Sequence, residues 1–131
     1  MVRGPDRTGS ICGVRDHSSL LAWQRARAVA LGAFRLAMHH WVPSAGPALT
    51  QLQRSALSVQ LNIAEGHALG SMPAFRRHLR IAYGSAVEAS ELLGLLRELK
   101  LAPPDSLEEL IVENRRCQQL VLALLHSLTP G

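Results

Sequence analysis

The chain has 131 residues, of which 47% are hydrophobic and 4% aromatic, and it carries a net charge of +4 with a sequence pI near 10.0. This length fits one domain with a buried core, and the dominance of Ala and Leu favours a helical protein over a disordered or fibrous one. The scarcity of aromatic residues disfavours a surface that stacks single-stranded bases. The two cysteines form neither a disulfide framework nor a metal-binding pattern.

Residues 1–17 mix Gly, Pro, Arg, Asp and Ser without apolar periodicity, and we predict that they form a flexible N-terminal leader ahead of a bundle domain at residues 18–131. This start lacks the apolar segment of a signal peptide, and no apolar run approaches the length of a membrane span. The sequence therefore predicts a cytoplasmic protein with no membrane partner.

Apolar residues recur at three- and four-residue spacing in four stretches, at residues 19–41, 47–65, 72–100 and 105–128. This spacing is typical of the buried face of an amphipathic helix. The predicted core faces are Trp23, Ala26, Ala30, Phe34, Ala37 and Trp41 in the first helix; Leu52, Ala56, Val59 and Ile63 in the second; Phe75, Leu79, Ala82, Ala86, Ala89, Leu93 and Leu96 in the third; and Leu107, Leu110, Asn114, Cys117, Val121, Leu124 and Leu128 in the fourth.

Residue types that begin and end helices lie in the gaps between these stretches. The predicted N-caps are Ser44 for the second helix, Ser71 for the third, and Asp105, with Glu108 completing a capping box, for the fourth. Gly66 is predicted to end the second helix in a left-handed conformation. Four helices joined by short connections predict an all-α, antiparallel up-and-down four-helix bundle.

The second and third helices carry more apolar residues than one bundle needs. The additional residues are Leu57, Leu61 and Ala64 on the second helix and Ile81, Leu92 and Leu99 on the third. Surplus apolar faces on a small protein favour a partner helix, most simply from another copy of the chain. We therefore predict a homo-oligomer.

A row of polar residues runs along one face of the second helix, between its apolar stripes. Its members are Gln51, Ser55, Ser58, Asn62 and Glu65, and the third helix offers Tyr83, Ser85, Glu88 and Glu91 as partners. One interpretation is a hydrogen-bonded network that fixes the helix register, and the other is a catalytic site built on Asn and Glu. We favour the network, because the row lacks a combination of nucleophile, base and oxyanion donor.

The six histidines contain no Glu-x-x-His or His-x-x-x-His pair, so we predict no metal site and no cofactor. His39 and His40 are adjacent and would diverge on a helix, whereas His78 and His126 are isolated in the sequence. We expect structural or solvent-facing roles for all of them.

The charges divide the chain into a basic and an acidic part. From residue 17 to residue 87, seven arginines oppose the single acid Glu65, a net charge of +6, whereas seven acids oppose four bases from Glu88 onward, a net charge of −3. The candidate nucleic-acid-binding residues are Arg25, Arg35, Arg54, Arg76, Arg77 and Arg80. Specific RNA-recognition motifs are missing, so any contact would be to the phosphate backbone.

Three of these arginines, Arg76, Arg77 and Arg80, lie near the start of the third helix, where the helix dipole disfavours cations. Helix stability therefore does not explain them. Three interpretations stay open: ion pairs with another helix or subunit, binding of nucleic-acid phosphates, and a solvated basic surface without a ligand.

The run from Gln51 to Gly66, QLQRSALSVQLNIAEG, followed by IAYGSAVEASELL from Ile81 to Leu93, resembles the bacterial four helix bundle protein family. That family includes proteins encoded in intervening sequences of the large ribosomal RNA gene, and it is similar to the accessory protein of diversity-generating retroelements. The matching positions are Arg54, Ser58, Asn62, Glu65 and Gly66 on the second helix and Gly84, Ser85 and Glu88 on the third.

The resemblance implies a homopentamer of antiparallel four-helix protomers, with a basic surface proposed to bind nucleic acid and no catalytic activity. It also suggests a reverse transcriptase or another nucleic-acid enzyme as a partner. Within it, Arg54, Ser58, Asn62, Glu65, Ser85 and Glu88 are expected to form a structural polar row. The alternative function is a protein-interaction scaffold whose arginines pair with neighbouring subunits and bind no nucleic acid.

Overall fold

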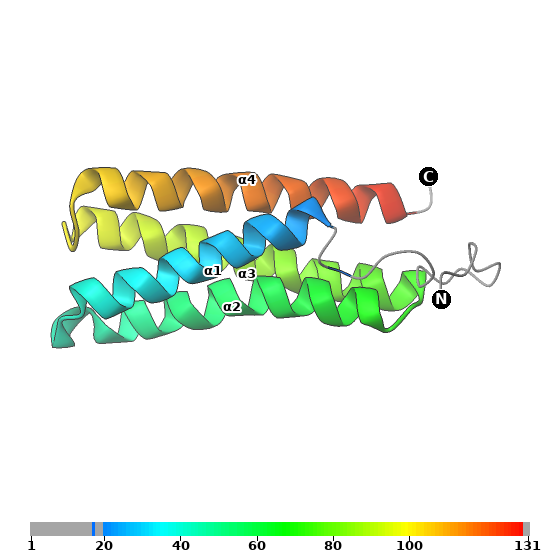
Figure 1. Ribbon diagram of the computed structural model, residues 1–131, viewed down its shortest axis with the longest axis horizontal. Coiled ribbons are helices and arrows are strands. Elements are labelled where there is room, and N and C mark those ends of the chain that lie inside the picture. Colours follow the sequence, from blue (N-terminus) through cyan, green and yellow to red (C-terminus); the bar gives the residue numbers. More distant parts are fainter. Residues whose placement is uncertain (1–16, 18–19, 130–131) are drawn as a thin grey trace.

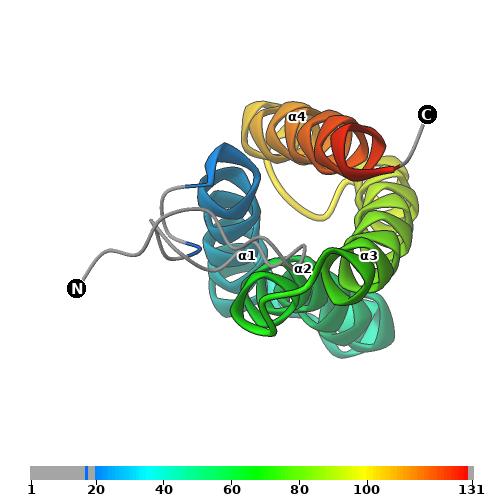
Figure 2. The same cartoon turned by 90° about the vertical axis from the view of Figure 1, so that its right-hand side faces the viewer.

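Four long helices follow one another along the chain: α1 (Leu21–His40), α2 (Gly46–Ala68), α3 (Met72–Glu98) and α4 (Pro104–Leu128), with the short 3-10 helix η2 (Pro43–Ala45) before α2. Figure 1 shows that each helix runs antiparallel to the one before it, and Figure 2 shows the four arranged in chain order around a common axis. The computed structural model describes residue 17 and residues 20–129. Apart from His17, the predicted leader lies outside the described residues. The prediction of an all-α, up-and-down four-helix bundle is confirmed.

The core consists of one cluster of buried residues to which all four helices contribute. Every predicted core residue of α2 and α3 is buried, as are Leu107, Leu110, Asn114, Cys117 and Val121 of α4. Near the end of α4, Leu125 is buried in place of the predicted Leu124 and Leu128, which are half-buried.

The predicted core face of α1 is wrong in its bulky members. Phe34 is 37% and Trp41 50% exposed, and Trp23 is only half-buried. The residues that α1 buries are Ala22, Ala26, Val29, Ala30, Ala33, Leu36 and Ala37. A face of mostly alanines lets α1 approach its neighbours closely, so the helix is rotated and its aromatic side chains lie at the edge of the bundle.

Two of the three predicted N-caps are also wrong. The side chain of Ser71 does accept a hydrogen bond from Ala74 N at 3.3 Å and begins α3 as predicted. Ser44 instead lies within η2, and no side chain caps α2. Asp105 lies in the first turn of α4, which begins one residue earlier because Pro103 and Pro104 supply an extended residue followed by a fixed helical φ.

Gly66 does not end α2, which continues to Ala68, and the left-handed glycine of this turn is Gly70 with φ 76°. Gly66 is buried where α2 crosses α3. A Cβ atom at this position would lie 2.6 Å from Cβ of His78 and 3.1 Å from Cδ1 of Phe75. The glycine therefore allows the close approach of two helices and does not serve as a cap.

Large apolar side chains remain exposed on several helices of the protomer. They include Leu31, Phe34 and Met38 on α1 with Trp41 directly after it, Leu57 and Leu61 on α2, and Ile81 and Leu95 on α3 with Leu99 directly after it. Among the described residues, no helix is both long enough and apolar enough to span a membrane.

Candidate polar network and nucleic-acid interface

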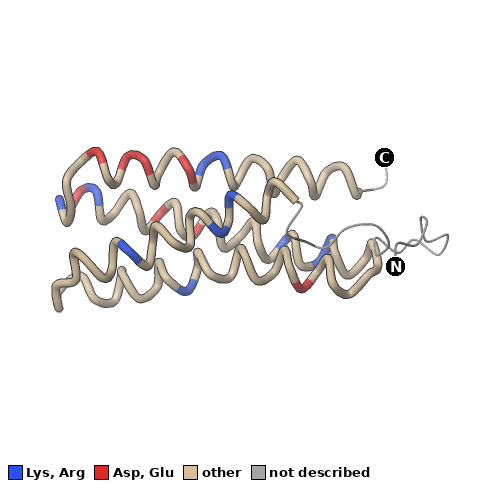
Figure 3. Tube along the Cα trace, viewed as in Figure 1, with Lys and Arg blue, Asp and Glu red and all other residues tan. Residues whose placement is uncertain are grey.

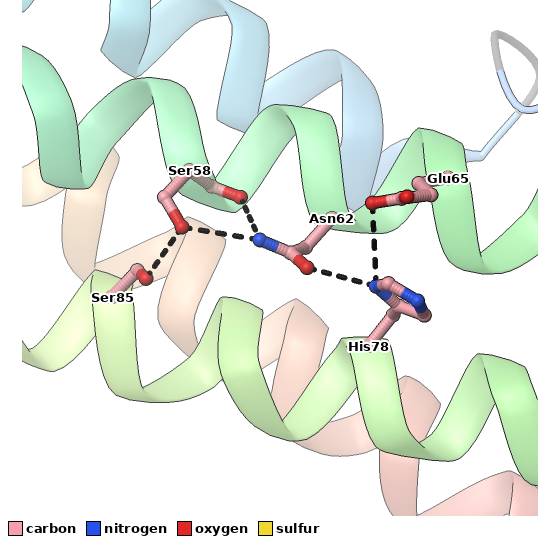
Figure 4. A network of polar contacts seen from close by, with 5 residues as sticks. All are labelled: Ser58, Asn62, Glu65, His78 and Ser85. Carbon is pink, nitrogen blue, oxygen red and sulfur yellow. Dashed lines mark hydrogen bonds and ion pairs between the residues drawn. The ribbon is translucent and has the colours of Figure 1, made fainter.

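Polar side chains from α2 and α3 meet in a continuous chain of contacts between the two helices (Figure 4). Ser58 Oγ lies 2.8 Å from Ser85 Oγ, and Asn62 Nδ2 donates to Ser58 O at 2.9 Å and to Ser58 Oγ at 3.1 Å. Asn62 Oδ1 lies 2.9 Å from His78 Nδ1, and Glu65 Oε2 lies 3.7 Å from the same nitrogen. We call these five residues the α2–α3 network.

The donors and acceptors of the α2–α3 network follow from chemistry. The carbonyl oxygen of Ser58 can only accept, so the amide nitrogen of Asn62 must face it and Oδ1 must face His78. Because Oδ1 also only accepts, His78 Nδ1 must carry a proton. The network thus satisfies polar groups that would be costly to bury alone.

His78 is the member of the network that sequence reasoning missed: although it is isolated from other histidines in the sequence, the structure places it against Asn62 and Glu65. Its side chain is 9% exposed, whereas that of Glu65 is 64% exposed, so the carboxylate covers the imidazole from the solvent side. A signal was present in the sequence, because His78 precedes Ser85 by seven residues and therefore lies on the same face of α3.

The remaining residues of the predicted polar row lie around the network. Gln51 Nε2 donates to Glu88 Oε2, and the buried Ser55 donates from Oγ to Leu52 O at 3.2 Å within its own helix. Arg54 is exposed and makes no polar contact within the described part of the chain, so the structure places it outside the network.

Asn114 and Cys117 of α4 lie buried away from this network. Asn114 of α4 is 1% exposed and donates from Nδ2 to Ala86 O of α3 at 3.1 Å, while its Oδ1 has no partner. Burial, and secondarily the charge of Glu113, raises the pKa of the Cys117 thiol to about 12. This cysteine is therefore a protonated core residue and a poor nucleophile at neutral pH.

Two of the candidate arginines are bound within the protomer. Arg25 pairs with Glu113 of α4 at 3.0 Å. Arg76 donates from its guanidinium to Leu128 O at 2.9 Å. In this way the cation at the start of α3 lies against the C-terminal end of the antiparallel α4, where a helix dipole favours positive charge. This contact gives Arg76 a partner within the protomer, so neither an acidic side chain nor a bound anion is needed to account for a cation at the start of α3.

The other candidates, Arg35, Arg54, Arg77 and Arg80, are exposed and lack an ion pair among the described residues. Figure 3 shows basic residues on α1, α2 and the first part of α3, whereas acidic residues gather on α4 and the second part of α3. Over the described residues up to Val87, Glu65 is the single acid. The free arginines therefore lie in the part of the chain that carries a net positive charge.

A groove of about 440 Å³ opens to solvent between the second half of α1 and the first half of α4. Arg35, His39 and His40 line it from α1, and Ser106, Glu109 and Glu113 line it from α4. Neither in this groove nor elsewhere within the described residues is a group of three or more His, Cys, Asp or Glu side chains placed to hold a metal ion.

The four antiparallel helices define a four-helix bundle protein. Several residues that carry the family resemblance, among them Ser58, Asn62 and Ser85, lie in the α2–α3 network and hold those two helices together. A family model described as 23S rRNA-intervening sequence protein matches residues 18–123, and the chain belongs to this family. The family resemblance identified from the sequence is thereby confirmed.

The fold is also similar to the crystal structure of a protein with unknown function from the S23 ribosomal protein family from Bacteroides thetaiotaomicron. The two chains share 20% sequence identity with a TM-score of 0.70, over 80% of this chain and 98% of that one. At this identity the similarity shows a common fold only. None of the curated proteins searched matches the chain.

Proposed function

We propose that this protein is a non-enzymatic, homo-oligomeric bundle that binds the backbone of RNA or DNA through an arginine-rich surface. In this proposal it acts in the cytoplasm as an accessory to a nucleic-acid enzyme, such as a reverse transcriptase. The observation that carries the proposal is the group of exposed arginines without ion pairs, Arg54, Arg77 and Arg80, on helices that hold a single acid before Glu88.

Salt-dependent binding tests this proposal directly. The protein should bind fluorescently labelled RNA and DNA duplexes with an affinity that falls steeply as salt rises, because phosphate contacts release counterions. The double variant Arg77→Glu/Arg80→Glu should lose at least about tenfold in affinity at low salt. Arg76 is left unchanged, since its contact with Leu128 O is structural.

The matched control is Arg115→Glu/Arg116→Glu, which makes the same charge change at exposed positions of the acidic helix α4. Anisotropy across a salt series compares both variants with the unmodified protein. Equal losses in the two variants would show that net charge alone matters and that the surface of Arg77 and Arg80 is not the binding site.

The proposed self-association is supported by two exposed apolar surfaces that lie on different helices. On one, the 53% exposed Leu61 lies on the helix that carries Arg54, and Arg27 of α1 lies beside the neighbouring Leu57; on the other, the 57% exposed Leu99 lies just after α3 and follows Glu98. Packing the first surface of one copy on the second surface of the next would form a head-to-tail ring. Five copies is the number that the family resemblance implies.

Light scattering at micromolar concentration should therefore give the mass of an oligomer of the 14.2 kDa chain. Leu61→Glu should reduce that mass, because it places a charge within the apolar contact. Leu21→Glu is the control, since Leu21 is 52% exposed at the start of α1. A monomeric unmodified protein would contradict the self-association.

The alternative function is an interaction scaffold that binds no nucleic acid. One observation favours it: Arg25 and Arg76 already make contacts within the protomer, so some arginines of this chain serve packing. The duplex titration separates the two functions. An oligomer that binds no duplex at low salt would support the scaffold and reassign Arg77 and Arg80 to subunit contacts.

A further inference from the structure

The groove between α1 and α4 has an apolar floor and polar walls. Its floor is apolar, formed by Gly32, Leu36 and Leu110. A Cβ atom on Gly32 would lie 2.7 Å from Cδ1 of Leu110, so the absence of a side chain at this position lets the two helices approach closely beneath the groove. The volume of about 440 Å³ falls within the range of small-molecule sites.

One end of the groove is held by an ion pair and the rest of it is not. Arg25 and Glu113 pair at 3.0 Å and fix the two helices there. Farther along, Arg35 on one wall and Glu109 on the other are both exposed, and neither forms an ion pair within residues 20–129. The groove thus presents an unpaired cation and an unpaired carboxylate on opposite walls.

This pattern restricts the chemistry of a ligand. A simple anion would suit Arg35, with His39 and His40 beside it, but the carboxylate of Glu109 would repel it. A simple cation would be attracted by Glu109 but repelled by Arg35. The matching ligand carries an anionic group at one end and N–H donors at the other, joined by a group that can cover the apolar floor.

We infer that the α1–α4 groove binds a nucleoside monophosphate unit, with its phosphate at Arg35 and the exocyclic amino group of its base donating to Glu109. Guanidinium groups recognise phosphate oxygens, and carboxylates accept hydrogen bonds from the amino group of cytosine. The unit can come from a free nucleotide or from an unpaired end of a nucleic acid. This inference goes beyond the backbone binding proposed above and does not depend on it.

Calorimetric titration of the full chain with CMP, UMP and inorganic phosphate tests the inference. CMP should bind measurably, and UMP should bind about tenfold more weakly, because uracil places an acceptor oxygen where cytosine carries its amino group. Phosphate alone should bind more weakly than CMP. Arg35→Gln should reduce the affinity for CMP by about tenfold or more, since it removes a charge-assisted hydrogen bond.

The variant Glu109→Gln gives the sharper readout. A glutamine amide can both accept and donate, so the preference for CMP over UMP should disappear while phosphate binding is retained. The matched controls are Arg116→Gln and Glu91→Gln, which remove one charge each at exposed positions outside the groove. Both should bind CMP as the unmodified protein does.

A duplex with a single-stranded 3′ cytidine, compared with a blunt duplex, distinguishes the two sources of the ligand. Tighter binding of the overhang, lost in Arg35→Gln, assigns the groove to a nucleic-acid end, whereas equal binding assigns it to free nucleotides. The inference is overturned if CMP does not bind, if it binds no better than phosphate, or if Arg35→Gln and Arg116→Gln behave alike. Binding of CMP without any duplex binding would contradict only the proposed function.

Discussion

Replacing Gly66 with alanine is expected to lower the free energy of unfolding by about 2 kcal/mol. The new Cβ would lie 2.6 Å from Cβ of His78, an atom close to the backbone of α3 that cannot move away by a change of rotamer. Alanine is the better helix former by about 1 kcal/mol, but this gain is smaller than the cost of forcing two packed helices apart.

The control for this prediction is Gly84→Ala. Gly84 also lies inside a helix, yet a Cβ atom there would meet no atom within 4 Å beyond its chain neighbours and the backbone of its own helix. This variant should therefore gain up to about 1 kcal/mol from helix propensity alone. Urea unfolding followed by far-ultraviolet circular dichroism measures both variants. If Gly66→Ala were as stable as Gly84→Ala, the close contact of α2 and α3 at this point would be contradicted.

The contrast between these two glycines shows where sequence reasoning stopped. Gly66 follows Glu65 at the end of an apolar pattern, and locally this is the arrangement of a glycine that ends a helix. Its real function depends on His78 and Phe75, which belong to another helix, so the glycine cannot be interpreted without the tertiary packing. The same applies to Arg76, whose partner, Leu128 O, lies at the end of the chain.

The sequence predicts the buried faces of α2 and α3 better than that of α1, and the difference has a physical reason. The apolar stripes of α2 and α3 were predicted correctly because large residues such as Ile63, Leu79 and Leu93 mark the buried faces, and the buried alanines lie in line with them. In α1 the buried face is mostly alanine, whereas Phe34 and Trp41 lie outside it, so the largest hydrophobic residues indicated the wrong side. Small residues that permit close helix approach carry little signal in a hydrophobic pattern.

The sequence predicts that the polar residues of α2 share one face of the helix, but it does not predict all of their hydrogen-bond partners on α3. Helical spacing alone places Ser58 and Asn62 together and offers Ser85 across from them. Spacing does not say which residue of α3 lies opposite Asn62, and this depends on how far α2 and α3 are shifted along one another. The structure shows that shift: Gly66 packs against His78 and Phe75, and His78 lies opposite Asn62.

Replacing Asn62 with leucine should lower the free energy of unfolding by about 2 kcal/mol or more. Leucine has nearly the shape of asparagine but leaves the proton of His78 Nδ1 without its acceptor at 2.9 Å, in a side chain that is 9% exposed. Glu65, at 3.7 Å, is too far away to replace that hydrogen bond. The loss is one of stability, and duplex binding by the folded fraction should be retained.

The double variant Asn62→Leu/His78→Leu separates loss of the bond from loss of packing. Because it removes donor and acceptor together, it should be less destabilised than the sum of the two single variants, with a coupling energy of about 1–2 kcal/mol.

Asn114→Leu is the matched control for the same substitution in the core. Asn114 Oδ1 is already without a partner, and its Nδ2 bonds to a carbonyl in the middle of α3, so leucine there should be neutral or stabilising. Equal destabilisation by both Asn→Leu variants would mean that the hydrogen bonds of the α2–α3 network add nothing to the free energy of unfolding beyond side-chain packing.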